Sequence, residues 1–311
     1  MKRIVSLSLI LVLAITLVAC GGASSTPTTA AAASTTVAAA SPTSTTMVSP
    51  TAAAAPPTSS PTATAMTEPT ISGKLTIFAA ASLTEAFNEM KNEIEAANPG
   101  TKITLNFAGS SALRTQITQG AQADIFASAD QTNMAPVEQA GDIVGGTSIF
   151  VQNRLVLLIP RGNPGKINRL QDLANPGLKL VLAQEQVPVG NYARQSLDKM
   201  SADPAFGADF KQKVLANVAS NELNVKDVVA KVQLGEADAG IVYQTDASSA
   251  DPAKVTMIDI PDQYNIVAQY PIGVVKGGSN PDGANAFITY LRSPAGQAVM
   301  SKYGFIPAPA H

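Results

Sequence analysis

Short apolar runs alternate with helical segments along residues 74–308, and this alternation limits the folds open to the chain. The runs expected as strands are 75–81, 103–108, 123–128, 155–160, 178–183, 240–243, 255–260 and 272–275. The segments expected as helices are 82–97, 109–120, 133–139, 192–200, 205–215, 225–234, 284–292 and 295–303. Strands that alternate with helices of this length predict an α/β fold, with parallel sheets flanked by helices.

The amino-terminal segment has the pattern of a secretory signal. Lys2 and Arg3 precede an apolar run over residues 4–18, which is shorter than the roughly 20 residues that a membrane-spanning helix needs. The run ends in small residues around Cys20 and resembles the lipobox of bacterial lipoproteins, in which the cysteine is acylated. We expect a signal peptide over 1–19 and a lipid anchor on Cys20; the alternative is an ordinary signal with an incidental cysteine.

The segment 20–72 has a composition unlike the rest of the chain. Of its positions 23–72, 44 of 50 are Ala, Thr, Ser or Pro, and only Glu68 is charged. Such a segment buries too little apolar surface to offset its ordering entropy, so we expect a disordered linker. The folded unit is then the domain that covers residues 73–308.

Composition excludes several kinds of chemistry from that domain. The chain has one His, His311, and one Cys, Cys20, so a His/Cys zinc site, a Ser-His-Asp triad and a Cys-His dyad lack their residues. The formal net charge of −2 is unlike the basic footprint of a nucleic-acid-binding protein. No phosphate-loop, dinucleotide or HExxH motif occurs, and no cofactor is expected.

Small polar residues stand where three strands are expected to meet helices. They are at Ser82, at Ser110 and in the segment 187–192. Free backbone N–H groups at a helix start bind anions, and a serine hydroxyl adds a donor. Serine is also a favoured N-cap, and Ser82 with Glu85 matches a capping box. An anion site and simple capping are both open at this point.

Two aspartates beside an expected strand, and one tyrosine, each allow a structural and a functional interpretation. Asp124 and Asp130 flank an expected strand, where turn and capping roles are favoured over a paired-carboxylate site. Tyr243 ends an apolar run, and a tyrosine there is either a core aromatic or a ligand-binding phenol.

Two serines have a basic residue nearby on the same expected helix. Ser110 precedes Arg114, and Ser196 precedes Lys199. No third group that would orient a base is evident, and such helical spacing is common, so a nucleophilic role is disfavoured.

Several motifs, in order, resemble the molybdate-binding proteins of ABC importers, a family of periplasmic solute-binding proteins. The resemblance covers about residues 74–307. The segments that carry it are 78–86 (FAAASLTEA), 107–113 (FAGSSAL), 123–131 (ADIFASADQ), 187–192 (VPVGNY), 240–246 (GIVYQTD) and 303–305 (YGF).

The resemblance implies a fold and a ligand. It implies a two-lobed, type II binding-protein fold with the oxyanion in the cleft, lobe I covering about 73–153 and 269–308 and lobe II about 154–268. It implies binding by the residues Ser82, Ser110, Val189, Val225 and Tyr243, through hydroxyls and backbone N–H groups. The metal would be held by the same residues, through the oxygens of molybdate or tungstate.

Further expectations follow from the same resemblance. The chain would be a monomeric binding protein and not an enzyme. It would be lipid-anchored outside the cytoplasm and would deliver its oxyanion to the permease subunits of an ABC importer. Gly109 stands where members of the family often have Ser, and Val189 stands where they often have Ala. Both replacements keep the backbone N–H donor and change only how well the ligand fits the cavity. The alternatives are a receptor for sulfate or another tetrahedral oxyanion, a hydrolase built on Ser110, and an adhesion or signalling lipoprotein.

Overall fold

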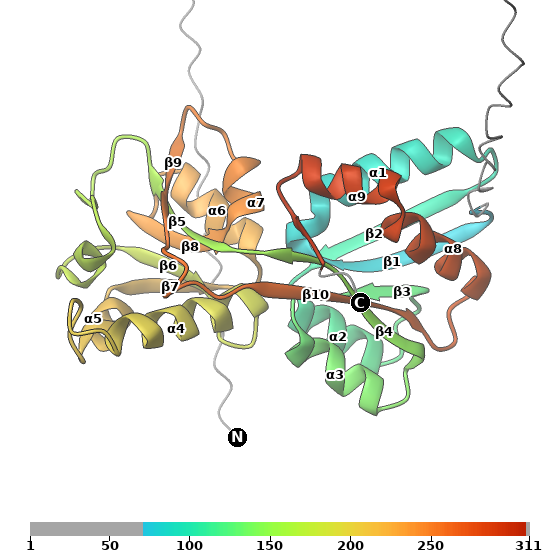
Figure 1. Ribbon diagram of the computed structural model, residues 1–311, viewed down its shortest axis with the longest axis horizontal. Helices are drawn as coiled ribbons and strands as arrows, with labels where there is room; N and C mark the ends of the chain where they lie inside the picture. Colours follow the sequence, from blue (N-terminus) through green and yellow to red (C-terminus); the bar gives the residue numbers. More distant parts are fainter. Residues whose placement is uncertain (1–70, 309–311) are drawn as a thin grey trace, which may run out of the picture. The chain divides into compact units, whose positions relative to one another are not determined.

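The computed structural model describes residues 71–308, which form two α/β lobes, each built on its own sheet (Figure 1). The expected signal peptide, Cys20 and the linker as far as residue 70 lie outside the described residues, as does His311. Within 71–308, no helix is long and apolar enough to cross a membrane.

Lobe I is a six-stranded mixed sheet between two helical layers. Its strands are β1 (Lys74–Ala80), β2 (Lys102–Ala108), β3 (Ile125–Ala127), β4 (Ile143–Asn153), β10 (Ala268–Val275) and β11 (Ile306–Pro307), in the spatial order β11-β4-β10-β3-β1-β2. Its helices are the 3₁₀ turn η1 (Ala81–Leu83), α1 (Thr84–Ala97), α2 (Ser110–Thr118), α3 (Gln131–Gln139), α8 (Pro281–Arg292) and α9 (Pro294–Lys302). Strands β1, β2 and β3 are parallel, whereas β10 is antiparallel to β3 and β4. Figure 1 shows α1 and α9 on one side of this sheet and α2 and α3 on the other.

Lobe II has a five-stranded sheet of the same mixed kind. Its strands are β5 (Leu155–Pro160), β6 (Leu180–Ala183), β7 (Val218–Glu222), β8 (Ala239–Tyr243) and β9 (Val255–Asp259), in the order β7-β6-β8-β5-β9. Its helices are η2 (Leu170–Ala174), α4 (Pro188–Ser201), α5 (Phe210–Ala216), α6 (Val225–Gln233) and α7 (Gln244–Ser248). Strand β6 is parallel to β7 and β8, and β5 is antiparallel to β8 and β9.

The chain passes between the lobes twice, and the two passages lie together (Figure 1). Only Arg154 separates β4 from β5, and residues 260–267 lead from β9 back to β10. Asn153 and Ala268 are paired across the β4–β10 ladder. Residues at the ends of β4 and β10 are therefore at the junction of the lobes.

Apolar side chains hold each face of the lobe I sheet to its helices. Ile77 of β1 and Phe87 of α1 are fully buried on one face, while Phe126 of β3, Leu113 of α2 and Met134 of α3 pack on the other. Alternate residues of a strand point to opposite faces, so a strand covered on both sides is apolar throughout. This explains why β1 and β3 are readable in the sequence as continuous apolar runs.

Three strands are absent from the sequence-based expectation, and all three lack such a run. Strand β4 contains Gly145 and Gly146, both with positive φ, and is half exposed along its first part. Strand β7 is a polar edge strand, and β11 has only two residues. Their pairing with neighbours, rather than their own composition, makes them strands, and β4 and β10 make the lobe I sheet mixed instead of parallel.

Candidate functional site

Loops from both lobes line a small pocket that opens to solvent, with about 210 Å³ of empty space when the open solvent is included. The first lobe lines it with Ala80, Ala81, Ser82, Ala108, Gly109, Ser110 and Ala129, and the second with Val187, Pro188, Val189, Asn224, Val225 and Tyr243. The structure thus brings together all five residues predicted to bind the anion. They come from five separate segments of the chain.

The N-termini of three helices lie at this pocket. Helices α2, α4 and α6 begin at Ser110, Pro188 and Val225, all of which line it. The first four N–H groups of an α-helix have no acceptor within the helix, and they carry the positive end of its dipole. Gly109 and Val187 cap α2 and α4 in extended conformation without any side-chain bond. The convergence of these N-termini creates an environment suited to a negative charge.

Ser110 is held in place by an N–H group of the neighbouring loop. Its side chain is 1% exposed, and its Oγ accepts a hydrogen bond of 3.0 Å from the backbone N–H of Ala129. A hydroxyl has one proton to donate besides its acceptor lone pairs. The Ser110 proton is therefore available to a ligand oxygen in the pocket.

Ser82 does not form the capping box that the sequence predicts. Neither η1 nor α1 has a side-chain cap, and Glu85 pairs instead with Lys226 of the other lobe. The Ser82 Oγ lies 2.9 Å from the Tyr270 hydroxyl of β10. Burial in the core turns this hydroxyl towards a distant tyrosine, which a local capping pattern cannot reveal.

The junction of the lobes supports Ser82 through Tyr270. Asn153 donates from Nδ2 to the Tyr270 Oη at 3.3 Å and to the Thr245 Oγ1 at 2.8 Å. Desolvation by burial raises the pKa of Tyr270, so its phenol keeps its proton at neutral pH. When Tyr270 donates that proton to Ser82, the Ser82 proton is free to face the pocket.

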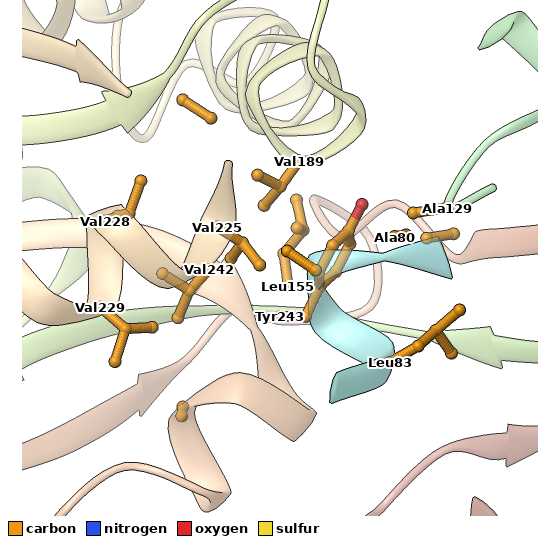
Figure 2. Packing of buried hydrophobic residues seen from close by; sticks show 14 of the residues in the cluster. Ala80, Leu83, Ala129, Leu155, Val189, Val225, Val228, Val229, Val242 and Tyr243 are labelled. Carbon is orange, nitrogen blue, oxygen red and sulfur yellow. The ribbon is translucent and has the colours of Figure 1, made fainter. Parts of the chain in front are cut away.

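Tyr243 has a hydroxyl with no hydrogen-bond partner among residues 71–308, although the side chain is 1% exposed. Figure 2 shows this oxygen directed to the space between Val189 and Ala129 in that view. Burial raises the pKa of Tyr243 well above its usual value, so the group is a neutral donor. A buried polar atom without a partner is costly, and one that lines a pocket is placed to bind a polar ligand atom.

Among residues 71–308, no charged side chain lines the pocket. Lys226, next to Val225, lies 2.7 Å from Glu85 and 2.9 Å from the Oδ1 of buried Asp246. Desolvation outweighs the attraction of Lys226 and raises the pKa of Asp246 to about 6. Lys226 is thus paired with two carboxylates, and none of these three side chains lines the pocket, so hydroxyls and backbone dipoles of the described residues face it.

The acidic candidates have structural roles. Asp130 caps α3 by accepting from the backbone N–H of Asn133 at 2.9 Å. Asp124 accepts from the backbone N–H groups of Thr76 and Asn280, both at 2.7 Å. The capping role favoured from the sequence is thus seen for Asp130, whereas Asp124 joins β1 and the residue before α8 to the start of β3. Within residues 71–308, no group of three or more His, Cys, Asp or Glu residues is placed to hold a metal ion.

The two serine–base pairs are not assembled in the described residues. No hydrogen bond joins Ser110 to Arg114, and the buried Ser196 Oγ has no hydrogen-bond partner. Lys199 donates to the backbone oxygen of Asn265 at 2.7 Å instead.

Sequence reasoning missed Asn224, Asn153 and Tyr270. Asn224 caps α6 by accepting from the backbone N–H of Asp227 at 3.1 Å, and an Asn three residues before an Asp just ahead of an apolar helix is a recognisable signal. Asn153 and Tyr270 have no such signal, because they meet only when β4 and β10 pair.

The chain matches the family model described as bacterial extracellular solute-binding protein over residues 75–306. It is 41% identical over 231 residues to a molybdate-binding protein of Mycobacterium tuberculosis, covering 74% of this chain and 84% of that protein. It is 32% identical over 232 residues to a putative ABC transporter substrate-binding lipoprotein of Bacillus subtilis, covering 74% and 85%. The solved substrate-binding domain of a putative molybdenum ABC transporter from Clostridium difficile superposes with a TM-score of 0.57 at 29% identity, covering 76% of this chain and all of that one.

Proposed function

Because this chain belongs to the family of bacterial extracellular solute-binding proteins, we propose that its cleft captures molybdate or tungstate for an ABC importer. The observation that carries the proposal is the pocket of neutral donors. Helix N-termini, two serine hydroxyls and the Tyr243 phenol surround a space in which the described residues place no charged side chain and no partner for that phenol. A fully ionised tetrahedral oxyanion can accept hydrogen bonds at every oxygen. The names of the relatives support this ligand class.

We propose that the bound oxyanion accepts hydrogen bonds from both lobes at once. Ser82 and Ser110 belong to lobe I, whereas Val189, Val225 and Tyr243 belong to lobe II. An ion that accepts from both sets binds better when the lobes are in contact than when they are apart, so it shifts the population towards contact. All of these donors come from one chain, so a monomer is the proposed working unit.

Titration calorimetry of the purified chain tests the proposed ligand. We expect one molybdate or tungstate ion per chain, with sulfate at least tenfold weaker. Sulfate matches the charge and hydrogen-bonding capacity of molybdate, but its shorter bonds would leave several donors too far from its oxygens. Tight binding of sulfate without binding of molybdate would instead favour the alternative, a receptor for sulfate. If neither molybdate nor tungstate gives a binding signal, the proposed function is wrong.

The hydrolase alternative has little support in the pocket. The Ser110 Oγ accepts from the Ala129 N–H, and within residues 71–308 no carboxylate or lysine lines the same space to act as its base.

We further propose that Cys20 carries a lipid that anchors the protein to the outer face of the cell membrane. The support is the sequence around Cys20 and the lipoprotein relative. Several acyl chains anchor a protein stably, whereas one binds weakly. Cys20→Ala should move the protein from the membrane fraction to the soluble extracytoplasmic fraction, measured by detergent-free fractionation and immunoblotting. Ser24→Ala is the matched control, and membrane retention of Cys20→Ala equal to that control would disprove the anchor.

A further inference from the structure

Gly109 of lobe I lies against the backbone of lobe II beside the pocket. A Cβ added to Gly109 would lie 2.3 Å from the Leu223 carbonyl oxygen, a separation that real side chains do not show. The next nearest atoms are the Leu223 carbonyl carbon at 3.5 Å and the Val187 Cγ2 at 3.6 Å. All three atoms belong to lobe II, so only the approach of the other lobe excludes a side chain here.

The backbone of Gly109 does not itself need glycine. Its φ of −61° and ψ of 138° are ordinary extended values that any L-residue adopts. A substitution would therefore leave the conformation of lobe I undisturbed, and it would conflict only with the contact between the lobes.

We propose that Gly109 is a positioning residue that sets how closely the lobes approach over the bound oxyanion. Gly109 directly precedes Ser110, the donor from lobe I, and Leu223 lies two residues before Val225, a donor from lobe II. The contact between Gly109 and Leu223 thus fixes the spacing of donors on opposite sides of the ligand. The inference deepens the proposed function and rests on it for the identity of the ligand.

In this chain a side chain at Gly109 should cost affinity rather than folding, although relatives frequently have Ser at this position, because here the Leu223 carbonyl oxygen occupies the space of a Cβ. Relieving the overlap requires the lobes to separate by about 1 Å at this point, and hydrogen bonds of 2.7–3.2 Å do not survive such a shift. We expect Gly109→Ala to weaken molybdate binding at least tenfold, with the thermal midpoint of the ligand-free protein unchanged. Gly162→Ala is the matched control, since Gly162 has no positive φ and a Cβ there would meet nothing within 4 Å.

A cross-link between the lobes reports their contact without relying on the ligand. Lys226 of lobe II lies 2.7 Å from Glu85 of lobe I, so a carbodiimide can join the two as an amide when the lobes are in contact. The exposed pair Lys302 and Glu89 lies within lobe I at 2.6 Å and provides an internal reference. Peptide mass spectrometry gives the ratio of the two products, with and without saturating molybdate.

We expect Gly109→Ala to lower this ratio at least severalfold, and Gly162→Ala to leave it unchanged. Gly109→Asn is the second variant, because Asn is a favoured N-cap and cannot weaken α2 as a cap. A wild-type ratio in both Gly109 variants, or no cross-lobe product in the wild type, would overturn the inference. If the ratio falls but the wild type binds no molybdate, the proposed ligand is wrong and the positioning role of Gly109 stands.

Discussion

Replacing Tyr243 by Phe should weaken molybdate binding by roughly ten- to a hundredfold, because a hydrogen bond to a charged group contributes about 1.5–3 kcal/mol. The same change should not destabilise the ligand-free protein. The Tyr243 hydroxyl is buried and has no partner within residues 71–308, so its removal breaks no hydrogen bond there. Calorimetry and a thermal melt of one protein preparation measure both effects.

Tyr264→Phe is the matched control for this experiment, with the opposite expected pattern. The Tyr264 hydroxyl donates to the Asp203 Oδ2 at 2.6 Å, and Tyr264 does not line the pocket. Its replacement removes a hydrogen bond and should lower the thermal midpoint while the molybdate affinity stays unchanged. Wild-type affinity in Tyr243→Phe would show that this phenol does not contact the ligand.

Phosphate should bind at least a hundredfold more weakly than molybdate near neutral pH. Molybdate is a fully ionised dianion there, whereas phosphate keeps at least one proton. That proton needs an acceptor, and no carboxylate of the described residues lines the pocket. A serine or tyrosine hydroxyl that turns to accept it gives up its own hydrogen bond to the anion. An unpaired buried polar group costs about 1–3 kcal/mol, and the displaced donor adds a second loss.

Competition calorimetry at fixed pH measures this selectivity. The protein is first saturated with molybdate and then titrated with phosphate, with tungstate as the competitor that should displace it. Displacement of molybdate by an equal concentration of phosphate would mean that an acceptor faces the ligand, and the donor-only pocket would then be wrong.

The amino-acid sequence determined the features that depend on neighbours along the chain. Continuous apolar runs identify strands buried on both faces, such as β1 and β3, and the polar strand-to-helix junctions identify the helix starts that line the pocket. The capping role of Asp130 could be predicted for the same reason, whereas Asp124 binds the backbone of Thr76 and Asn280, which are 48 and 156 residues away. Anchoring at Cys20 stays a prediction, since that residue lies outside the described part of the chain.

Only the tertiary structure decided which of these local features meet. Ser82 matches a capping box, yet its hydroxyl lies against Tyr270, 188 residues away. Glu85, the expected partner of Ser82 in that box, pairs across the cleft with Lys226. Gly109 has an ordinary backbone conformation, and its need for glycine arises from the carbonyl of Leu223 in the other lobe. Hydrogen bonds and steric contacts act over a few ångströms in space, and a local pattern cannot state which distant segment the fold will bring within that range.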